Sequence, residues 1–265
     1  MPLRLNLLGG FALSVGGAKV ALPASPQRLL ALLALQPGSL PRACVAGTLW
    51  SESSEAHAHG SLRSALWKLR NTGLELVCQD GDQLELASTI DVDVRRFESL
   101  SRAVVSGALG EEVASMLAPQ LLGELLPGWY EEWVLLERER HRQVTLHALE
   151  QLCERLTAEG RHGAAVLAGL AAVAIEPLRE SAERALMRAY LAEGNAVEAL
   201  RRYEQYRRLA ARELGVGPSP LMRSLVEELQ QAESAGNDGV TARRAHLATW
   251  QHARVAQHAR VARQR

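Results

Sequence analysis

Hydrophobic and polar residues alternate along the start of the chain. Residues 3–7 place a leucine at every second position, and residues 11–15 repeat the alternation before the Gly-Gly pair at 16–17. A period of two predicts β-strands with one buried face, and paired glycines accept the positive φ angles of a tight turn. The pattern therefore predicts N-terminal strands, the second joined by a hairpin to a third run at 19–22.

Three helices and a second hairpin are predicted next. Residues 29–35 form a continuous Leu/Ala run that ends at a Pro-Gly pair, and Pro41 begins a second, shorter helix. A third helix extends from Glu55 to Asn71, and residues 75–86 alternate on both sides of an Asp-Gly pair. Strands, three helices and a hairpin follow one another in a winged helix-turn-helix domain, whose third helix fits the major groove of DNA.

The third predicted helix has two contrasting faces. Apolar residues at helical spacing predict a buried stripe made of Leu62, Ala65, Leu66 and Leu69. The opposite face carries hydrogen-bond donors, one aromatic side chain and no acid: Ser61, Arg63, Ser64, Trp67, Lys68, Arg70 and Asn71. Such a face suits DNA, but an ordinary amphipathic helix with a solvated basic face has the same pattern. Trp67 is compatible with a core, a subunit interface or a base contact.

The second part of the sequence is predicted to be helical from Phe97 to about Glu233, with breaks at 107–110, 127–128, 160, 177, 194 and 215–218. Ala158-Glu159-Gly160 recurs 34 residues later as Ala192-Glu193-Gly194. This period, with glycine at the turn, is typical of tetratricopeptide-like helix pairs, which stack and form concave protein-binding surfaces. A purely structural bundle without a partner groove is the alternative. The aromatic cluster at 129–133 precedes a long helix and is expected to pack in the core; a partner site is its other interpretation.

Composition and charge exclude several classes of protein. The 265-residue chain is 47% hydrophobic, with 30 basic and 30 acidic residues, which favours folded cores over disorder. No apolar run is long enough to span a bilayer, and the N-terminus lacks the order of a secretory signal, so we expect a cytoplasmic protein with no membrane partner. The neutral total conceals a basic N-terminal part, with seven basic and three acidic residues up to Gln79. An anionic partner is therefore compatible with zero net charge.

Motifs for catalysis, a cofactor or a metal are not found in the sequence. The three cysteines, Cys44, Cys78 and Cys153, have no metal-ligand spacing and are expected to be reduced thiols. His57 and His59 are two positions apart on a predicted helix, which points their rings about 200° apart. We therefore expect no metal site, no cofactor and no enzymatic activity.

Characteristic sequence motifs occur in both parts of the chain. The first part contains Leu-Leu-Gly-Gly-Phe at 7–11 and the segments 27–35 and 61–70. The second part contains the segments 129–134, 137–138, 177–182, 189–195, 198–203, 213–216 and 218–220. Together they resemble the Streptomyces antibiotic regulatory protein (SARP) type of transcriptional regulator, in which an OmpR-like winged helix precedes a bacterial transcriptional activator domain (BTAD).

This resemblance implies a fold and a function. The fold is an α+β winged helix-turn-helix domain at 1–94, followed by an all-α tetratricopeptide-like domain at 95–238. The function is a sequence-specific transcription activator that binds direct repeats in double-stranded promoter DNA as a homodimer and helps to recruit RNA polymerase. An adaptor built on helical repeats, whose winged-helix module does not bind DNA, is the alternative.

Site residues follow from the resemblance by position. The residues implied to face the DNA are Ser61, Arg63, Ser64, Trp67, Lys68, Arg70 and Asn71. Arg28 and Arg42, at the starts of the first two helices, are implied phosphate contacts. The wing tip departs from the family pattern, because residues 79–82 carry two aspartates and no basic residue.

Residues 239–265 are expected to form a separate basic tail. Gln-His-Ala-Arg-Val-Ala at 251–256 is repeated at 257–262, and six arginines and no acid occur from Val240 onward. This composition predicts a disordered or weakly helical arm. Added non-specific affinity for DNA and a repeat expansion without function are both compatible with it.

Overall fold

The computed structural model describes residues 2–106 and 122–227. The chain divides into two compact units, Met1–Glu176 and Pro177–Arg265. The basic tail predicted from residue 239 lies outside the described residues, as do the last helical residues predicted up to Glu233.

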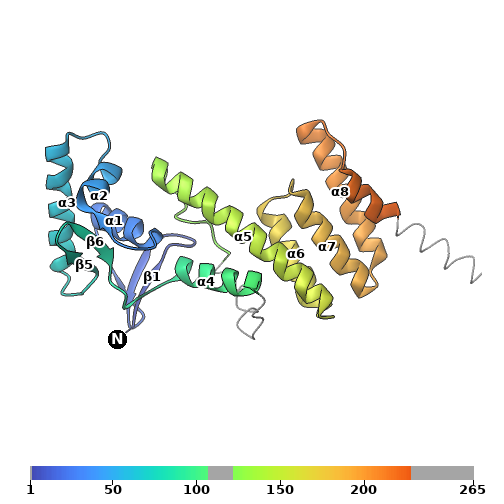
Figure 1. Ribbon diagram of the computed structural model, residues 1–265, viewed down its shortest axis with the longest axis horizontal. Helices are drawn as coiled ribbons and strands as arrows, with labels where there is room; N and C mark the ends of the chain where they lie inside the picture. Colours follow the sequence, from blue (N-terminus) through green and yellow to red (C-terminus); the bar gives the residue numbers. More distant parts are fainter. Residues whose placement is uncertain (1, 107–121, 228–265) are drawn as a thin grey trace, which may run out of the picture. The chain divides into compact units, whose positions relative to one another are not determined.

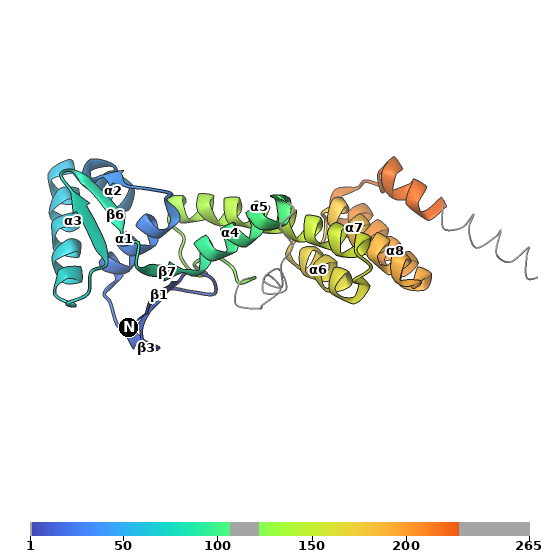
Figure 2. The same ribbon diagram turned by 60° about the horizontal axis from the view of Figure 1, so that its bottom comes forward.

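Two small sheets and three helices begin the first unit (Figures 1 and 2). The strands are β1 (Leu3–Asn6), β2 (Ala12–Val15), β3 (Ala18–Val20), β4 (Leu40–Pro41), β5 (Val77–Asp80), β6 (Gln83–Leu86) and β7 (Ile90–Val92). The helices are α1 (Ala24–Leu35), α2 (Arg42–Leu49) and α3 (Glu55–Arg70). One sheet has the order β3-β2-β1-β7 and the other the order β4-β6-β5. The arrangement confirms the predicted winged helix-turn-helix, with β5 and β6 as its wing.

Local sequence signals account for most of these elements. Leu5 and Leu7 of the first alternating run are fully buried, as the period of two predicted. Gly16 and Gly17 have φ angles of 58° and 91°, and Gly81 in the wing has 54°. These left-handed conformations favour glycine, so the glycine pair and the Asp-Gly pair form the turns of both hairpins.

The strand β7 is a feature that the sequence analysis did not predict. It pairs in parallel with β1, in the register Leu3↔Ile90. The carboxylate of Asp93, directly after β7, accepts hydrogen bonds from the backbone N–H groups of Leu7 and Leu8 at 3.0 Å. A three-residue strand whose partner lies at the other end of the domain leaves no periodic signal in the sequence.

The rest of the first unit is helical but interrupted. It contains α4 (Asp93–Ser106), α5 (Glu132–Ala158) and α6 (His162–Ile175). The predicted break at Pro127-Gly128 is observed, and the non-helical stretch is wider than predicted, covering residues 122–131 before α5. Leu125 in this segment forms an antiparallel bridge with Leu8, so these residues extend the edge of the N-terminal strand instead.

Arginine side chains hold the winged helix and the following helices together. Arg95 of α4 donates to the carbonyl oxygens of Leu33, Ala34 and Gln36 at the end of α1, over 2.9–3.0 Å. Arg138 of α5 donates to three carbonyls of the 125–129 segment. Carbonyls at the end of a helix or in a non-helical segment have no intrahelical partners, so a half-buried guanidinium with its fork of donors satisfies several at once.

A helix pair and a shorter helical segment form the described part of the second unit. It contains α7 (Glu180–Glu193), α8 (Ala196–Leu214) and helical residues at 220–227. Met187, Tyr206 and Met222, one from each segment, are buried in a common core. The carboxylate of Glu180 accepts hydrogen bonds from the backbone N–H and the hydroxyl of Ser219, which fixes the loop after α8.

Both units contain the repeated helix pair that the sequence predicted. The turn glycines Gly160 and Gly194 have φ angles of 74° and 89°. Ala165 of α6 and Ala199 of α8, 34 positions apart, are both fully buried. Small residues at these positions let the two helices of each pair approach closely, as α5 with α6 and α7 with α8 do. The all-α part of the predicted fold is confirmed.

Candidate nucleic-acid interface

Helix α3 forms the outer edge of the winged helix, with α1 and α2 behind it (Figure 1). Its buried stripe consists of Ala58, Leu62, Ala65, Leu66 and Leu69. These side chains pack toward α1 and α2, which keeps the helix in place by apolar burial. The predicted phase of the helix is therefore correct.

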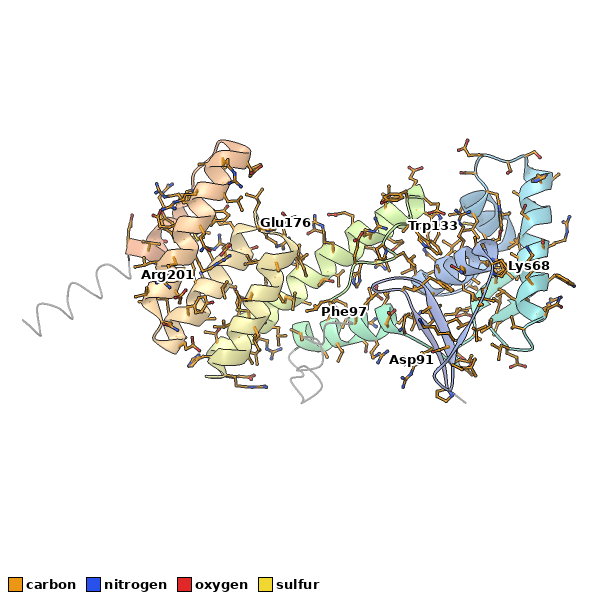
Figure 3. All side chains as sticks on the ribbon, turned by 180° about the vertical axis from the view of Figure 1, so that it is seen from behind. Lys68, Asp91, Phe97, Trp133, Glu176 and Arg201 are labelled. Carbon is orange, nitrogen blue, oxygen red and sulfur yellow. The ribbon has the colours of Figure 1, made fainter. Side chains whose placement is uncertain are left out.

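The opposite face of α3 points away from the domain, as Figure 3 shows for the side chains on this helix. Ser61 is half-buried at the edge of the face, and the other predicted residues are exposed: Arg63, Ser64, Trp67, Lys68, Arg70 and Asn71. Trp67 has 63% of its surface exposed. The core alternative for this tryptophan is thus excluded, and the face is open to a partner.

Charge on this face is almost entirely positive. Arg63 and Lys68 have no carboxylate partner within residues 2–106 and 122–227. The acidic residue of α3 is Glu55 in its first turn, and its Oε1 lies 3.9 Å from Nε2 of His59. From Ala56 to Arg70 the helix contains no acid. Cationic side chains that are free of internal partners can neutralise an external anion without first breaking an ion pair.

Arg42 and Arg70 come together beside the wing. Both guanidinium groups donate to the side-chain oxygen of Gln79 on β5, Arg70 over 3.0 Å and Arg42 over 3.4 Å. Because the side-chain amide of Gln79 is neutral, these hydrogen bonds do not compensate the positive charges of the two guanidinium groups. An open cleft of about 710 Å³ lies here between the C-terminal half of α3 and the wing. The structure thus groups Arg42 with the donors of α3, although the two segments are separate in sequence.

The wing itself has the opposite charge. Asp80 and Asp82 are exposed on either side of Gly81 at its tip. The carbonyl of Asp82 accepts a hydrogen bond from the backbone N–H of Arg42, which ties the tip to the start of α2. Repulsion between two carboxylates and phosphate opposes close contact of this tip with a duplex.

Arg28 has a different environment from the other predicted residues. Its guanidinium pairs with Glu131, at 2.6 Å, just before α5. Next to this pair, Trp129 stacks on Phe11 with ring centroids 6.1 Å apart. Trp129 is half-buried by this stacking and Tyr130 is 79% exposed, so the aromatic cluster lies at the edge of the fold and the predicted packing in the core was wrong for both. Arg28 therefore belongs to the contact between α1 and the 122–131 segment.

Sites for a metal are not found in the described part of the chain. It contains no group of three or more His, Cys, Asp and Glu side chains that could hold a metal ion. Cys44, Cys78 and Cys153 are free thiols, the first two of them exposed. No helix within the described ranges is long and apolar enough to cross a bilayer.

Comparison with known proteins agrees with this architecture. The pattern of the family described as "Bacterial transcriptional activator domain" matches residues 92–230. The chain belongs to this family. The SARP-type resemblance is thereby confirmed, because α4 to α8 all lie within the matched range.

Curated relatives of the family include regulators from two genera. The chain is 30% identical to Regulatory protein AfsR of Streptomyces coelicolor over 247 residues, which cover 88% of this chain and 25% of AfsR. It is 26% identical to Transcriptional regulatory protein MoaR1 of Mycobacterium tuberculosis, covering 85% of this chain and 78% of MoaR1. The chain thus spans about a quarter of the length of AfsR and most of MoaR1.

A solved structure shares the fold. Mycobacterium tuberculosis EmbR, in complex with a low affinity phosphopeptide, superimposes with a TM-score of 0.68 at 22% identity. The match covers 87% of this chain and 65% of EmbR. It supports the succession of an α+β domain and helical pairs in one protein.

Proposed function

We propose that this protein is a sequence-specific transcription regulator, an activator that binds double-stranded promoter DNA through α3. The observation that carries the proposal is the outward face of α3, on which hydrogen-bond donors and unpaired cations stand free of the fold. An α-helix fits the major groove, where donors of this kind distinguish base pairs. Its place in a family of bacterial transcriptional activator domains supports regulation rather than catalysis.

The roles of the residues follow from their positions. Arg63 and Ser64, in the middle of α3, suit contacts to base edges. Lys68 and the pair Arg42 and Arg70, toward the end of the helix and the wing, suit phosphate contacts. Contacts to phosphate position a protein on the duplex, and contacts to bases specify the sequence. Arg28 serves as a phosphate contact only if it releases Glu131.

We assign DNA binding and partner binding to different predicted domains. We place DNA binding in residues 1–94 and partner binding in the helical part, 95–238, with RNA polymerase as the partner. A homodimer on direct repeats fits one α3 into each half-site. A regulator of promoters acts on the chromosome, so we place the protein in the cytoplasm.

Binding to DNA is tested with the two lysines of the chain, Lys68 and Lys19. Lys68→Ala removes a cation from α3, whereas Lys19→Ala removes one from the exposed strand β3 and serves as the matched control. The full chain is titrated against DNA from upstream of its own gene by fluorescence anisotropy at several salt concentrations. Loss of one phosphate contact weakens binding to all sequences and lowers the slope of log K against log salt by about 0.9.

Base preference is tested separately with Arg63→Ala and Ser64→Ala. Each good base contact contributes about 1–3 kcal/mol of discrimination, so these variants are expected to change which base is preferred at one position. If all three α3 variants bind DNA with unchanged affinity and unchanged base preference, α3 does not bind in the major groove. A folded chain that binds no duplex at low salt contradicts the proposal and favours the helical-repeat adaptor.

A further inference from the structure

Trp67 is the large apolar side chain on the outward face of α3. It is 63% exposed, and no aromatic ring stacks on it in the part of the chain that the structure describes. A tryptophan side chain buries roughly 150–250 Å² when it is fully covered. The exposed indole of Trp67 therefore contributes little apolar burial to the stability of the fold. This position favours a residue that is covered by a partner in the functional complex.

The surroundings of Trp67 define the chemistry of that partner. One helical turn separates it from Arg63 on one side and Asn71 on the other, and Lys68 follows it directly. An apolar protein surface placed here would have to desolvate the neighbouring cations without compensation. A partner with anionic groups around a small apolar group satisfies both the charges and the indole.

The shape of the face limits where the indole can lie. Gly60 and Ser64 occupy the same line of the helix toward its N-terminus, and Trp67 lies about 10 Å beyond Gly60. A Cβ at Gly60 would contact no backbone and only the guanidinium of Arg63, at 3.7 Å. Gly60 therefore adds no side chain of its own beside the guanidinium of Arg63, and the indole lies further along the same line of the helix.

We propose that Trp67 contacts the 5-methyl group of a thymine in the major groove. This inference rests on the proposed function. Thymine presents the apolar group of the major groove, whereas the other base edges present hydrogen-bond donors and acceptors there. Trp67 thus selects a T·A pair in each half-site by apolar contact, next to the donors of Arg63 and Ser64.

The experiment removes the methyl group alone. Duplexes with a random core of about 20 base pairs, which holds two half-sites, are enriched with the full wild-type chain. The best sequence is synthesised with each thymine replaced in turn by deoxyuridine, and binding is measured for wild type, Trp67→Ala and Tyr130→Ala. Tyr130, which is 79% exposed against 63% for Trp67, is an exposed aromatic residue outside α3 and is the matched control. Melting curves verify that the variants fold.

One deoxyuridine position is expected to weaken binding of the wild type about fourfold, the effect of one buried methyl group. Tyr130→Ala is expected to retain this loss, and Trp67→Ala is expected to bind the two duplexes equally. A selected site without thymine, tolerance of deoxyuridine at every position, or the same loss in Trp67→Ala overturns the inference while the proposed function stands.

If Trp67→Ala instead changes only self-association of the chain, measured by sedimentation, Trp67 is a protein interface. If the wild type enriches no sequence at low salt, the proposed function fails and this inference with it.

Discussion

Gly123 lies in close contact with the turn after β1, in the segment that leads into α5. A Cβ built at this position would lie 2.9 Å from the backbone nitrogen of Gly9 and 3.2 Å from the carbonyl carbon of Leu8. Both are backbone atoms of the Leu8-Gly9 turn that follows β1, so no side chain can rotate away. Gly123→Ala is therefore expected to separate this segment from the strand.

The size of the effect follows from what the separation breaks. The backbone N–H of Gly9 donates to the carbonyl of Glu124, and that of Leu126 donates to the carbonyl of Leu7, both at 2.8 Å. Each bond contributes about 1 kcal/mol, and overpacking of a tight contact costs about 1–3 kcal/mol. We expect Gly123→Ala to lower the free energy of unfolding by about 3–5 kcal/mol, the sum of two hydrogen bonds and the overpacking.

Urea denaturation of the full chain measures this loss, and hydrogen exchange of the Gly9 and Leu126 amides locates it. Gly47→Ala on α2 is the control, because its added methyl group meets nothing within 4 Å. In a helix, alanine is more favourable than glycine by up to about 1 kcal/mol, so this variant is expected to be slightly more stable. A wild-type urea midpoint and unchanged exchange in Gly123→Ala would refute the contact between the segment and the strand.

Two further predictions concern the cores that position α3 and α5. Leu66→Ala is expected to cost about 2–5 kcal/mol of stability, because this side chain is 4% exposed and its truncation leaves a cavity; an unchanged melting temperature would contradict the phase of α3. His141 lies against Phe97, with ring centroids 5.2 Å apart, and burial, with a smaller effect of Arg140, lowers its pKa from 6.5 to about 4. The unfolded chain therefore binds the proton first, so stability falls by about 3 kcal/mol as the pH decreases from 6.5 to 4. Denaturation series across this range are expected to show a shallower fall in His141→Gln, and an equal fall in both proteins would exclude His141 as the cause.

Local patterns in the sequence determined the elements and the composition of the candidate surface. Alternation, the Gly-Gly and Asp-Gly pairs and the helical stripe from Leu62 to Leu69 depend on interactions between near neighbours, so they can be found without knowing the fold. The exposed side of α3 was predictable for the same reason, because one buried stripe defines the opposite face. The period of 34 residues likewise predicted the two helix pairs.

The tertiary structure alone decided which distant groups meet. The parallel pairing of β7 with β1, the bridge from Leu8 to Leu125 and the ion pair between Arg28 and Glu131 join segments that are far apart in the chain. The convergence of Arg42 and Arg70 on Gln79 belongs to the same class. Such contacts depend on the path of the chain through space, because a backbone N–H or a guanidinium can donate to any suitable oxygen that this path brings near. The sequence therefore determines that Arg28 is a cation at the start of a helix, and only the fold decides that a carboxylate reaches it.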